Sequence, residues 1–143
     1  MRLYLDNCCF NRPFDNQTQL RISLESQAKI EVQRMILDGV HTLVWSYMLE
    51  YENAQNPFDI RKDAIIKWKE ISEIIVLENE NILKTAEELL KLGIKPKDAI
   101  HISCAAESNC DYFLTTDLGI LKKNIDIIKI RNPIEFINEL EEL

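Results

Sequence analysis

The sequence predicts an α/β protein, a three-layer α/β/α sandwich with a short parallel sheet of four to five strands. Short apolar segments alternate with longer amphipathic ones along the 143 residues. The apolar segments contain few polar residues, which is typical of parallel strands covered on both faces. With only 3 glycines and 4 prolines, little of the chain is left for long loops. We therefore expect strands joined by right-handed helical crossovers.

The predicted strands are short and rich in apolar residues. They cover residues 3–5, 41–45, 74–77, 111–116 and 125–130. The segment 111–116 gives the clearest strand pattern. Two of the strands are followed directly by a carboxylate, Asp6 after the first and Asp117 after residues 111–116.

The predicted helices fill the intervals between these strands. The longest begins at Asp15 or Asn16, carries an apolar stripe, and ends at about Asp38, where Gly39 suits the residue after a helix. The others cover residues 46–56, 58–72, 79–92, 99–106, 118–123 and 133–143, the third of these opening at residue 79 or 81.

Size and composition predict one domain over residues 1–143. Hydrophobic residues make up 46% of the chain and charged residues 29%, which is ordinary for a globular protein in water. No apolar run approaches the length of a membrane span. An acid at position 6 also interrupts the region where a signal peptide would be apolar. We expect a protein that does not associate with membranes.

The four cysteines do not form a metal-binding pattern. Cys8 and Cys9 are adjacent, and Cys104 and Cys110 are not spaced as C-x-x-C. We expect reduced thiols and a cytoplasmic protein, without a zinc site.

The formal net charge is −7, with 17 basic and 24 acidic residues. A protein that passively coats nucleic acid usually needs a basic surface, so this class is disfavoured. An enzyme that acts on nucleic acid is not excluded, because a divalent cation reverses the sign of a carboxylate cluster.

Acids from separate segments are expected to meet at one edge of the predicted sheet. Asp6 and Asp117 follow strands, Glu50 and Glu52 lie in the helix that leaves the second strand, and Asp98 begins a helix that returns across the sheet. Each acid alone has an ordinary explanation, as a turn or helix cap, an exposed helix residue, or a first-turn acid that complements the helix dipole. Together they repel, by about 4 kcal/mol per pair at about 4 Å if the effective dielectric constant is about 20.

A divalent cation would offset this repulsion. Oxygen ligands without a histidine or cysteine pair indicate Mg²⁺ or Mn²⁺, and such a site suits phosphodiester hydrolysis. The sequence has no Walker A motif and no Ser-His-Asp order. His41 and His101 are not expected to be a metal pair; His101, one turn after Asp98, either supports the site from outside or packs in its helix.

Four ordered segments resemble the PIN-domain family of small metal-dependent ribonucleases, which includes VapC-type toxins. They are residues 3–6 (LYLD), 44–46 (VWS) followed by an acid, 97–102 (KDAIHI) and 113–117 (FLTTD). Each motif is short, but the set spans almost the whole chain. The resemblance implies catalytic carboxylates at Asp6, Asp98 and Asp117 that also bind Mg²⁺ or Mn²⁺.

The resemblance also implies a catalytic glutamate from the second segment. The family places it six residues after the strand-end Ser or Thr, and counting from Ser46 gives Glu52, with Glu50 as the alternative. Thr115 matches the hydroxyl two residues before the last aspartate and is expected to position that site or its water.

Further residues near the same edge are candidates for substrate contacts. Asn7 and Asn11 lie in the loop after the first strand, where polar side chains help to hold substrate or metal. Arg12, Lys95 and Lys97 are expected near the edge, where they would meet phosphates or remain ordinary surface cations.

One departure from the family concerns the number of metal ions. A further acid often follows the last motif, whereas this chain has Leu118-Gly119-Ile120. The resemblance therefore leaves open whether the site binds one ion or two.

The leading hypothesis is a Mg²⁺- or Mn²⁺-dependent endoribonuclease that cleaves RNA, the toxin of a toxin–antitoxin pair, with an antitoxin protein as partner and a possible homodimer. The alternatives are a non-catalytic PIN-like scaffold that binds RNA or protein, and a metal-dependent phosphohydrolase or receiver-like domain. The phosphohydrolase lacks its Asp-x-Asp because position 8 is Cys, and the receiver lacks a paired acid beside Asp6.

Overall fold

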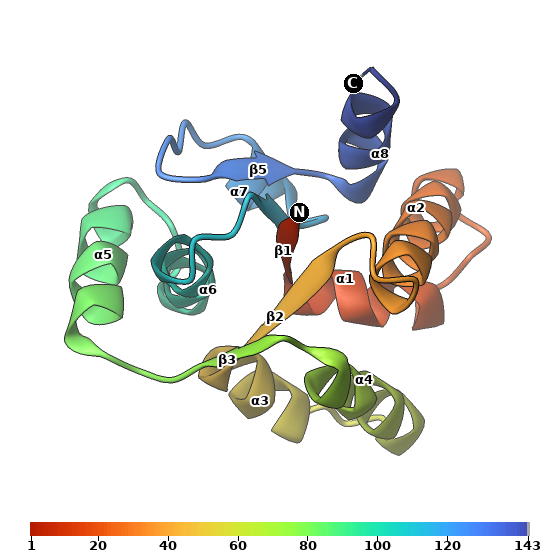
Figure 1. Ribbon diagram of the computed structural model, residues 1–143, viewed down its shortest axis with the longest axis horizontal. Helices are drawn as coiled ribbons and strands as arrows, with labels where there is room; N and C mark the ends of the chain where they lie inside the picture. Colours follow the sequence, from red (N-terminus) through yellow and green to blue (C-terminus); the bar gives the residue numbers. More distant parts are fainter. Residues whose placement is uncertain (143) are drawn as a thin grey trace.

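A parallel β-sheet forms the middle layer of the molecule (Figure 1). The structure, a computed structural model, describes residues 1–142. The strand order is β3-β2-β1-β4-β5, and every neighbouring pair is parallel. The strands are β1 (Arg2–Leu5), β2 (Thr42–Ser46), β3 (Ile74–Val76), β4 (Tyr112–Leu114) and β5 (Lys129–Arg131).

Helices cover both faces of this sheet, with α5 and α6 on one side and α2 and α8 on the other (Figure 1). The helices are α1 (Asn7–Asn11), the 3₁₀ turn η1 (Arg12–Phe14), α2 (Leu20–Leu37), α3 (Tyr47–Ala54), α4 (Asp59–Ile71), α5 (Glu80–Lys91), α6 (Pro96–Glu107), α7 (Leu118–Leu121) and α8 (Pro133–Glu141). The predicted three-layer α/β/α sandwich is therefore confirmed. Across the described chain, no helix combines the length and apolar character needed to cross a membrane.

The central strand β1 explains how the sheet is held and aligned. Leu3, Tyr4 and Leu5 are fully buried, as expected for a strand with helices on both faces. In the register of β1 with β4, Leu5 lies beside Leu114. The carboxyl ends of these two strands therefore stop at the same level, and the residues that follow them emerge side by side.

The segment after β1 differs from the prediction. Residues 7–14 are helical, in α1 and η1, and α2 begins at Leu20, so the predicted helix start at Asp15 or Asn16 is wrong. Pro13 lies inside η1, where its fixed backbone angle is tolerated. Asp15 pairs with Arg12 and Arg61 rather than capping α2.

Other element boundaries also shift. The last strand covers Lys129–Arg131 rather than residues 125–130, because pairing with the three residues of β4 sets its length. Helix α6 begins at Pro96, three residues before the predicted start at Ala99, with proline in the first turn. Leu143, part of the predicted terminal helix and domain, lies outside the described residues.

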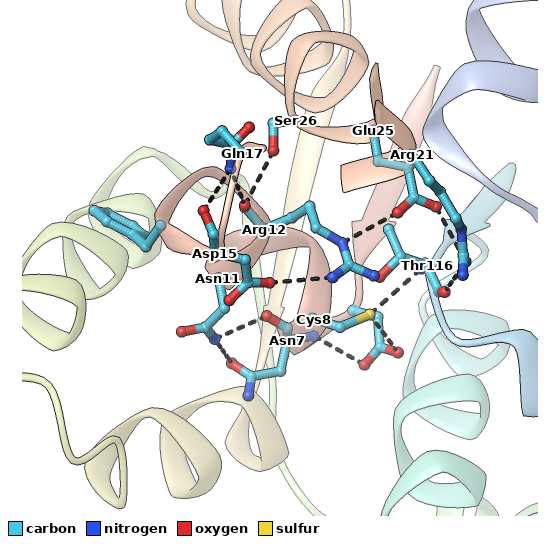
Figure 2. A network of polar contacts seen from close by, with 12 residues as sticks. Asn7, Cys8, Asn11, Arg12, Asp15, Gln17, Arg21, Glu25, Ser26 and Thr116 are labelled. Carbon is cyan, nitrogen blue, oxygen red and sulfur yellow. Dashed lines mark hydrogen bonds and ion pairs between the residues drawn. The ribbon is translucent and has the colours of Figure 1, made fainter. Parts of the chain in front are cut away.

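A buried carboxylate ties together the segments that surround this sheet edge (Figure 2). Glu25 of α2 is fully buried and pairs with Arg12 at 3.1 Å and with Arg21 at 3.3 Å. The oxygen that pairs with Arg21 also accepts a hydrogen bond from the Asn132 amide at the start of α8. Arg21 in turn donates to the carbonyl oxygen of Thr116 at 2.9 Å. One side chain thus links the segments after β1, β4 and β5.

Replacement of Glu25 by Ala is expected to lower the free energy of unfolding by about 3 to 5 kcal/mol, because it leaves the partly buried Arg12 without its buried partner. Urea-induced unfolding followed by circular dichroism measures the change. Glu31→Ala is the matched control: Glu31 lies on the same helix and also pairs with an arginine, Arg34, but at the exposed surface. Equal losses in the two variants would contradict the structural role of Glu25.

Candidate functional site

Asp6 stands at the carboxyl end of β1 and is held by neighbours on both sides. It is 5% exposed, and its backbone N–H continues the sheet by donating to the Leu114 carbonyl at 2.9 Å. One carboxylate oxygen accepts from the Asn7 N–H at 2.8 Å, which makes Asp6 the N-cap of α1. The other accepts from the Thr115 hydroxyl at 2.8 Å. Asp6 is both a cap and a carboxylate oriented at the sheet edge.

Thr115 connects the two strand-end aspartates. Its buried hydroxyl donates to Asp6 and accepts the Asp117 N–H at 3.1 Å. Asp117 caps α7 by accepting the Gly119 N–H at 2.7 Å. A single hydroxyl therefore couples the positions of the segments that carry Asp6 and Asp117.

Glu52 faces the same edge through a chain of buried polar groups. Its carboxylate accepts from the Asn7 amide at 3.0 Å and lies 2.6 Å from His101 Nε2. The other ring nitrogen, Nδ1, lies 2.5 Å from the Tyr4 hydroxyl, which is 2.6 Å from the Ser46 hydroxyl. The chain runs from α3 through α6 to β1 and the end of β2, so it fixes the imidazole in one orientation.

The pKa shifts of His101 and Glu52 support an ion pair between these two side chains. Burial alone lowers the pKa of His101, but the hydrogen bond to Glu52 and the charges of Asp6, Glu52 and Asp98 raise it overall. Burial alone raises the pKa of Glu52, but hydrogen bonding from His101 holds it below its usual value. His101 Nε2 also lies 3.9 Å from Asp6. The imidazole thus lies between two of the predicted acids.

Glu50 and Glu52 point to different surroundings. Glu50 accepts a hydrogen bond from the Trp45 indole at 3.0 Å and pairs with Lys69 at 3.0 Å. These partners belong to β2 and α4, whereas Glu52 contacts Asn7 and His101. The structure therefore places Glu52, and not Glu50, beside Asp6.

The surroundings of Asp98, including the other acids, raise its pKa. Asp98 lies in the first turn of α6, half-buried. Burial, followed by the negative charges of Asp6 and Asp117, raises the pKa of Asp98 to about 6. The charges of Glu52 act in the same direction, and that of His101 opposes them. The acids that the sequence predicts to converge therefore do interact electrostatically across four segments.

The arrangement of these acids and their donor chemistry point in different directions for a divalent ion. Among residues 1–142, no three His, Cys, Asp or Glu side chains are grouped closely enough to hold a metal ion as they stand. Thr115, Asn7 and His101 instead contact oxygens of Asp6 and Glu52. The donor chemistry does fit, because a cluster of carboxylates that raises the pKa of Asp98 favours a hard cation such as Mg²⁺ or Mn²⁺. The ligand roles of Asp6, Asp98 and Asp117 stay predictions.

Two lysines border the acids on the α6 and α7 side. Lys95 and Lys123 line a small cavity of about 120 Å³ together with Asp98 and Asp117. Gly93 makes room for Lys123, since a Cβ at that glycine would come within 2.9 Å of the lysine Nζ. The position of these amines suits an anionic ligand beside the carboxylates.

The remaining predicted residues divide into two groups. Asn7 and Asn11 lie beside Glu52, and the Asn11 amide donates to the Asn7 carbonyl at 3.1 Å (Figure 2). Lys97 lines a second hollow, together with Asn7, Asn11 and Glu52, and its amine lies over the Tyr51 ring. Arg12 instead pairs with Asp15 and Glu25, so protein carboxylates already balance its charge.

Sequence reasoning left two contributors to this edge without a definite role. His101 has the KDAIHI context, but only its contacts with Glu52 and Tyr4 distinguish a supporting residue from a packed one. No sequence pattern marks Lys123 as a site residue. Only the folded structure brings its amine close to Gly93, which lies far from it in the sequence. The spacing of Asp98 and His101, one helical turn, was the available clue for the first.

Metal-free protein is expected to show Asp98 titrating near pH 6, and Asp117→Asn is expected to lower that pKa because one repelling charge is removed. Carbon-13 NMR of the carboxyl groups in EDTA measures it. Because the folded pKa of Asp98 lies above its unfolded one, the contribution of Asp98 to the free energy of unfolding should fall as pH rises from about 4 to about 6. Asp111→Asn, at the opposite end of β4, is the control; an unchanged Asp98 pKa in Asp117→Asn would contradict the convergence.

Comparison with known proteins supports the fold. No family model and no curated protein sequence matches the chain. A chain of the crystal structure of VapBC2 from Rickettsia felis, bound to a DNA fragment from their promoter, superposes on this one with a TM-score of 0.58 at 13% sequence identity. The match covers 91% of this chain and 97% of that chain. The five-stranded parallel sheet between its helix layers therefore has a PIN-like fold.

Proposed function

We propose that this chain is a Mg²⁺- or Mn²⁺-dependent endoribonuclease. The observation that carries the proposal is the cavity shared by Asp98 and Asp117, with Asp6 joined to Asp117 through Thr115. Burial, and after it the negative charges of Asp6, Asp117 and Glu52, raises the pKa of Asp98 there. A carboxylate cluster in this position of a PIN-like fold suits metal-dependent cleavage of a phosphodiester bond. The adjacent amines of Lys95 and Lys123 suit the phosphate that such a reaction needs.

The proposed mechanism assigns each group a task. Asp6, Asp98 and Asp117 would hold the ion, which when bound lowers the pKa of a water and offsets phosphate charge. Thr115 keeps Asp6 in line with Asp117.

Glu52, oriented by His101 and Asn7, would position the water through its carboxylate. Lys95 and Lys123 would draw the phosphate toward the acids.

The partner in this proposal is an antitoxin protein. One similar solved structure is a VapBC2 assembly on promoter DNA, which supports a toxin–antitoxin context for this fold. The proposal would be supported by a short reading frame next to the gene whose product copurifies with this chain and suppresses its activity. A homodimer remains part of the proposal, and light scattering in solution tests it.

A non-catalytic PIN-like scaffold is the second candidate. It is favoured by one observation, namely that the acids in the described chain are not arranged as a ready metal site. Calorimetric titration with Mn²⁺ separates the two, because the nuclease should bind the ion and lose that binding in Asp98→Asn. A folded protein without Mn²⁺ or Mg²⁺ affinity would favour the scaffold.

Purified protein is expected to cleave single-stranded RNA with Mg²⁺ or Mn²⁺ and not in EDTA. Glu52→Gln should lower the rate about 100-fold or more, the scale of removing one group that acts at the transition state. Glu50→Gln should stay close to the unmodified protein, because its partners are Trp45 and Lys69. Fluorogenic RNA assays over a range of metal concentrations measure both. The reverse order of the two variants would reassign the glutamate to position 50.

His101→Gln is expected to reduce activity by about 10- to 100-fold and to raise the metal concentration needed for half-maximal rate, since supporting residues around metal ligands have effects of that size. Tyr4→Phe removes the hydroxyl that contacts His101 Nδ1, on the ring edge away from Glu52, and should have a smaller effect in the same direction. The metal dependence distinguishes positioning from a general loss of folding. Full activity and unchanged metal dependence in His101→Gln would show that the imidazole does not orient Glu52.

A further inference from the structure

We propose that the hollow beside Glu52 binds one nucleobase of the RNA and selects it by its hydrogen-bonding edge, an inference that rests on the proposed function. The hollow has a volume of about 300 Å³, which is at the small end for ligand sites. Its walls contain four amide side chains, an aromatic ring and an arginine. These are Asn7, Asn11, Gln55, Asn56, Phe58 and Arg61.

Three of the amides are held in a row that begins at the catalytic candidate. The Asn7 amide donates to Glu52 at 3.0 Å, the Asn11 amide donates to the Asn7 carbonyl at 3.1 Å, and the Asn56 amide donates to the Asn11 side-chain oxygen at 3.2 Å. Asn56 also accepts the Phe58 N–H at 3.1 Å. These bonds fix the orientation of the row, so its remaining donors and acceptors are preorganised.

Gln55 is the amide that remains available for a ligand. It is exposed at the C-terminal end of α3, and within residues 1–142 its side chain has no hydrogen bond to another side chain. An amide offers one acceptor and two donor hydrogens, which match the paired donor and acceptor on a base edge. Gln55 is therefore the residue that we assign to base selection.

Phe58 supplies a surface on which a base can stack. Its side chain is 54% exposed, and the Arg61 guanidinium lies 4.5 Å from the ring centre. Arg61 is held by Asp15 at 3.2 Å and by the Phe14 carbonyl at 2.8 Å, so it steadies the ring. Exposed aromatic rings beside cationic groups bind successive bases of single strands in this way.

The charge and polarity of the hollow favour a nucleotide over a protein anchor. Lys97 lines it together with the amides, and its amine suits a phosphate that flanks a base. The apolar anchor residues of a protein partner would need apolar walls. Amide edges and one exposed ring instead match the polar edge and the flat face of a base.

Binding in EDTA tests the pocket without cleavage. Fluorescence anisotropy compares labelled hexamers of A, C, G and U with the full chain. One base should be preferred by about 5-fold or more, and Gln55→Ala should remove most of that preference. Phe58→Leu should weaken all four by about 5- to 100-fold, whereas Phe58→Tyr, which keeps the ring, should not.

Phe14→Leu is the matched control, because Phe14 is exposed and contacts Arg61 but does not line the hollow. Equal binding by Phe58→Leu and the unmodified chain, absence of any hexamer binding, or equal affinity for the four bases would each overturn the inference and leave the hollow to another occupant, such as a protein. Base-selective, Phe58-dependent binding without metal-dependent cleavage would refute the nuclease and keep the pocket. Metal-dependent cleavage by the unmodified chain, together with unchanged RNA binding in Phe58→Leu, would support the nuclease and refute the pocket.

Discussion

The parallel pairing of β1 with β4 is the constraint on which the rest of the site depends. Because Leu5 lies beside Leu114, the N–H of Asp6 reaches the Leu114 carbonyl and the Thr115 hydroxyl reaches the Asp6 carboxylate. A shift of one residue would turn the strand side chains to the opposite face. The buried Tyr4 hydroxyl opposes that shift, because on the other face it would lose its contacts with Ser46 and His101. Strand pairing and these polar contacts together set the relative position of Asp6 and Asp117.

A second layer of polar contacts converts this alignment into an oriented group of side chains. Glu25 binds the segments after β1 and β4 from one side, and the chain from Ser46 through Tyr4 and His101 reaches Glu52 from the other. Both are buried, so each member needs its partner to offset the loss of water. Burying these polar groups costs free energy, which is consistent with a site whose function depends on their geometry.

The acids and amides divide the sheet edge into two neighbouring regions. On the α6 and α7 side, Asp98 and Asp117 lie with Lys95 and Lys123. On the α3 and α4 side, Glu52 forms the boundary of a hollow that continues to Asn56 and Phe58. In the proposed nuclease, the first region holds the scissile phosphate and the second holds an adjacent base. Glu52 lies between the region where cleavage occurs and the region that selects the base.

The sequence by itself determined the alternation of helices and strands, the parallel sheet, and the placing of Asp6, Asp98 and Asp117 at one edge, because these follow from local apolar runs and from the geometry common to all parallel sheets. Only the tertiary structure decided that Glu52 rather than Glu50 lies beside Asp6, that His101 contacts Glu52, and that Lys123 returns to Gly93. Boundaries such as the start of α2 at Leu20 were likewise decided by the partners of Asp15. These features depend on contacts between residues far apart in the chain. Spacing favoured Glu52 and hinted at His101, but local propensity does not encode which distant side chains they contact.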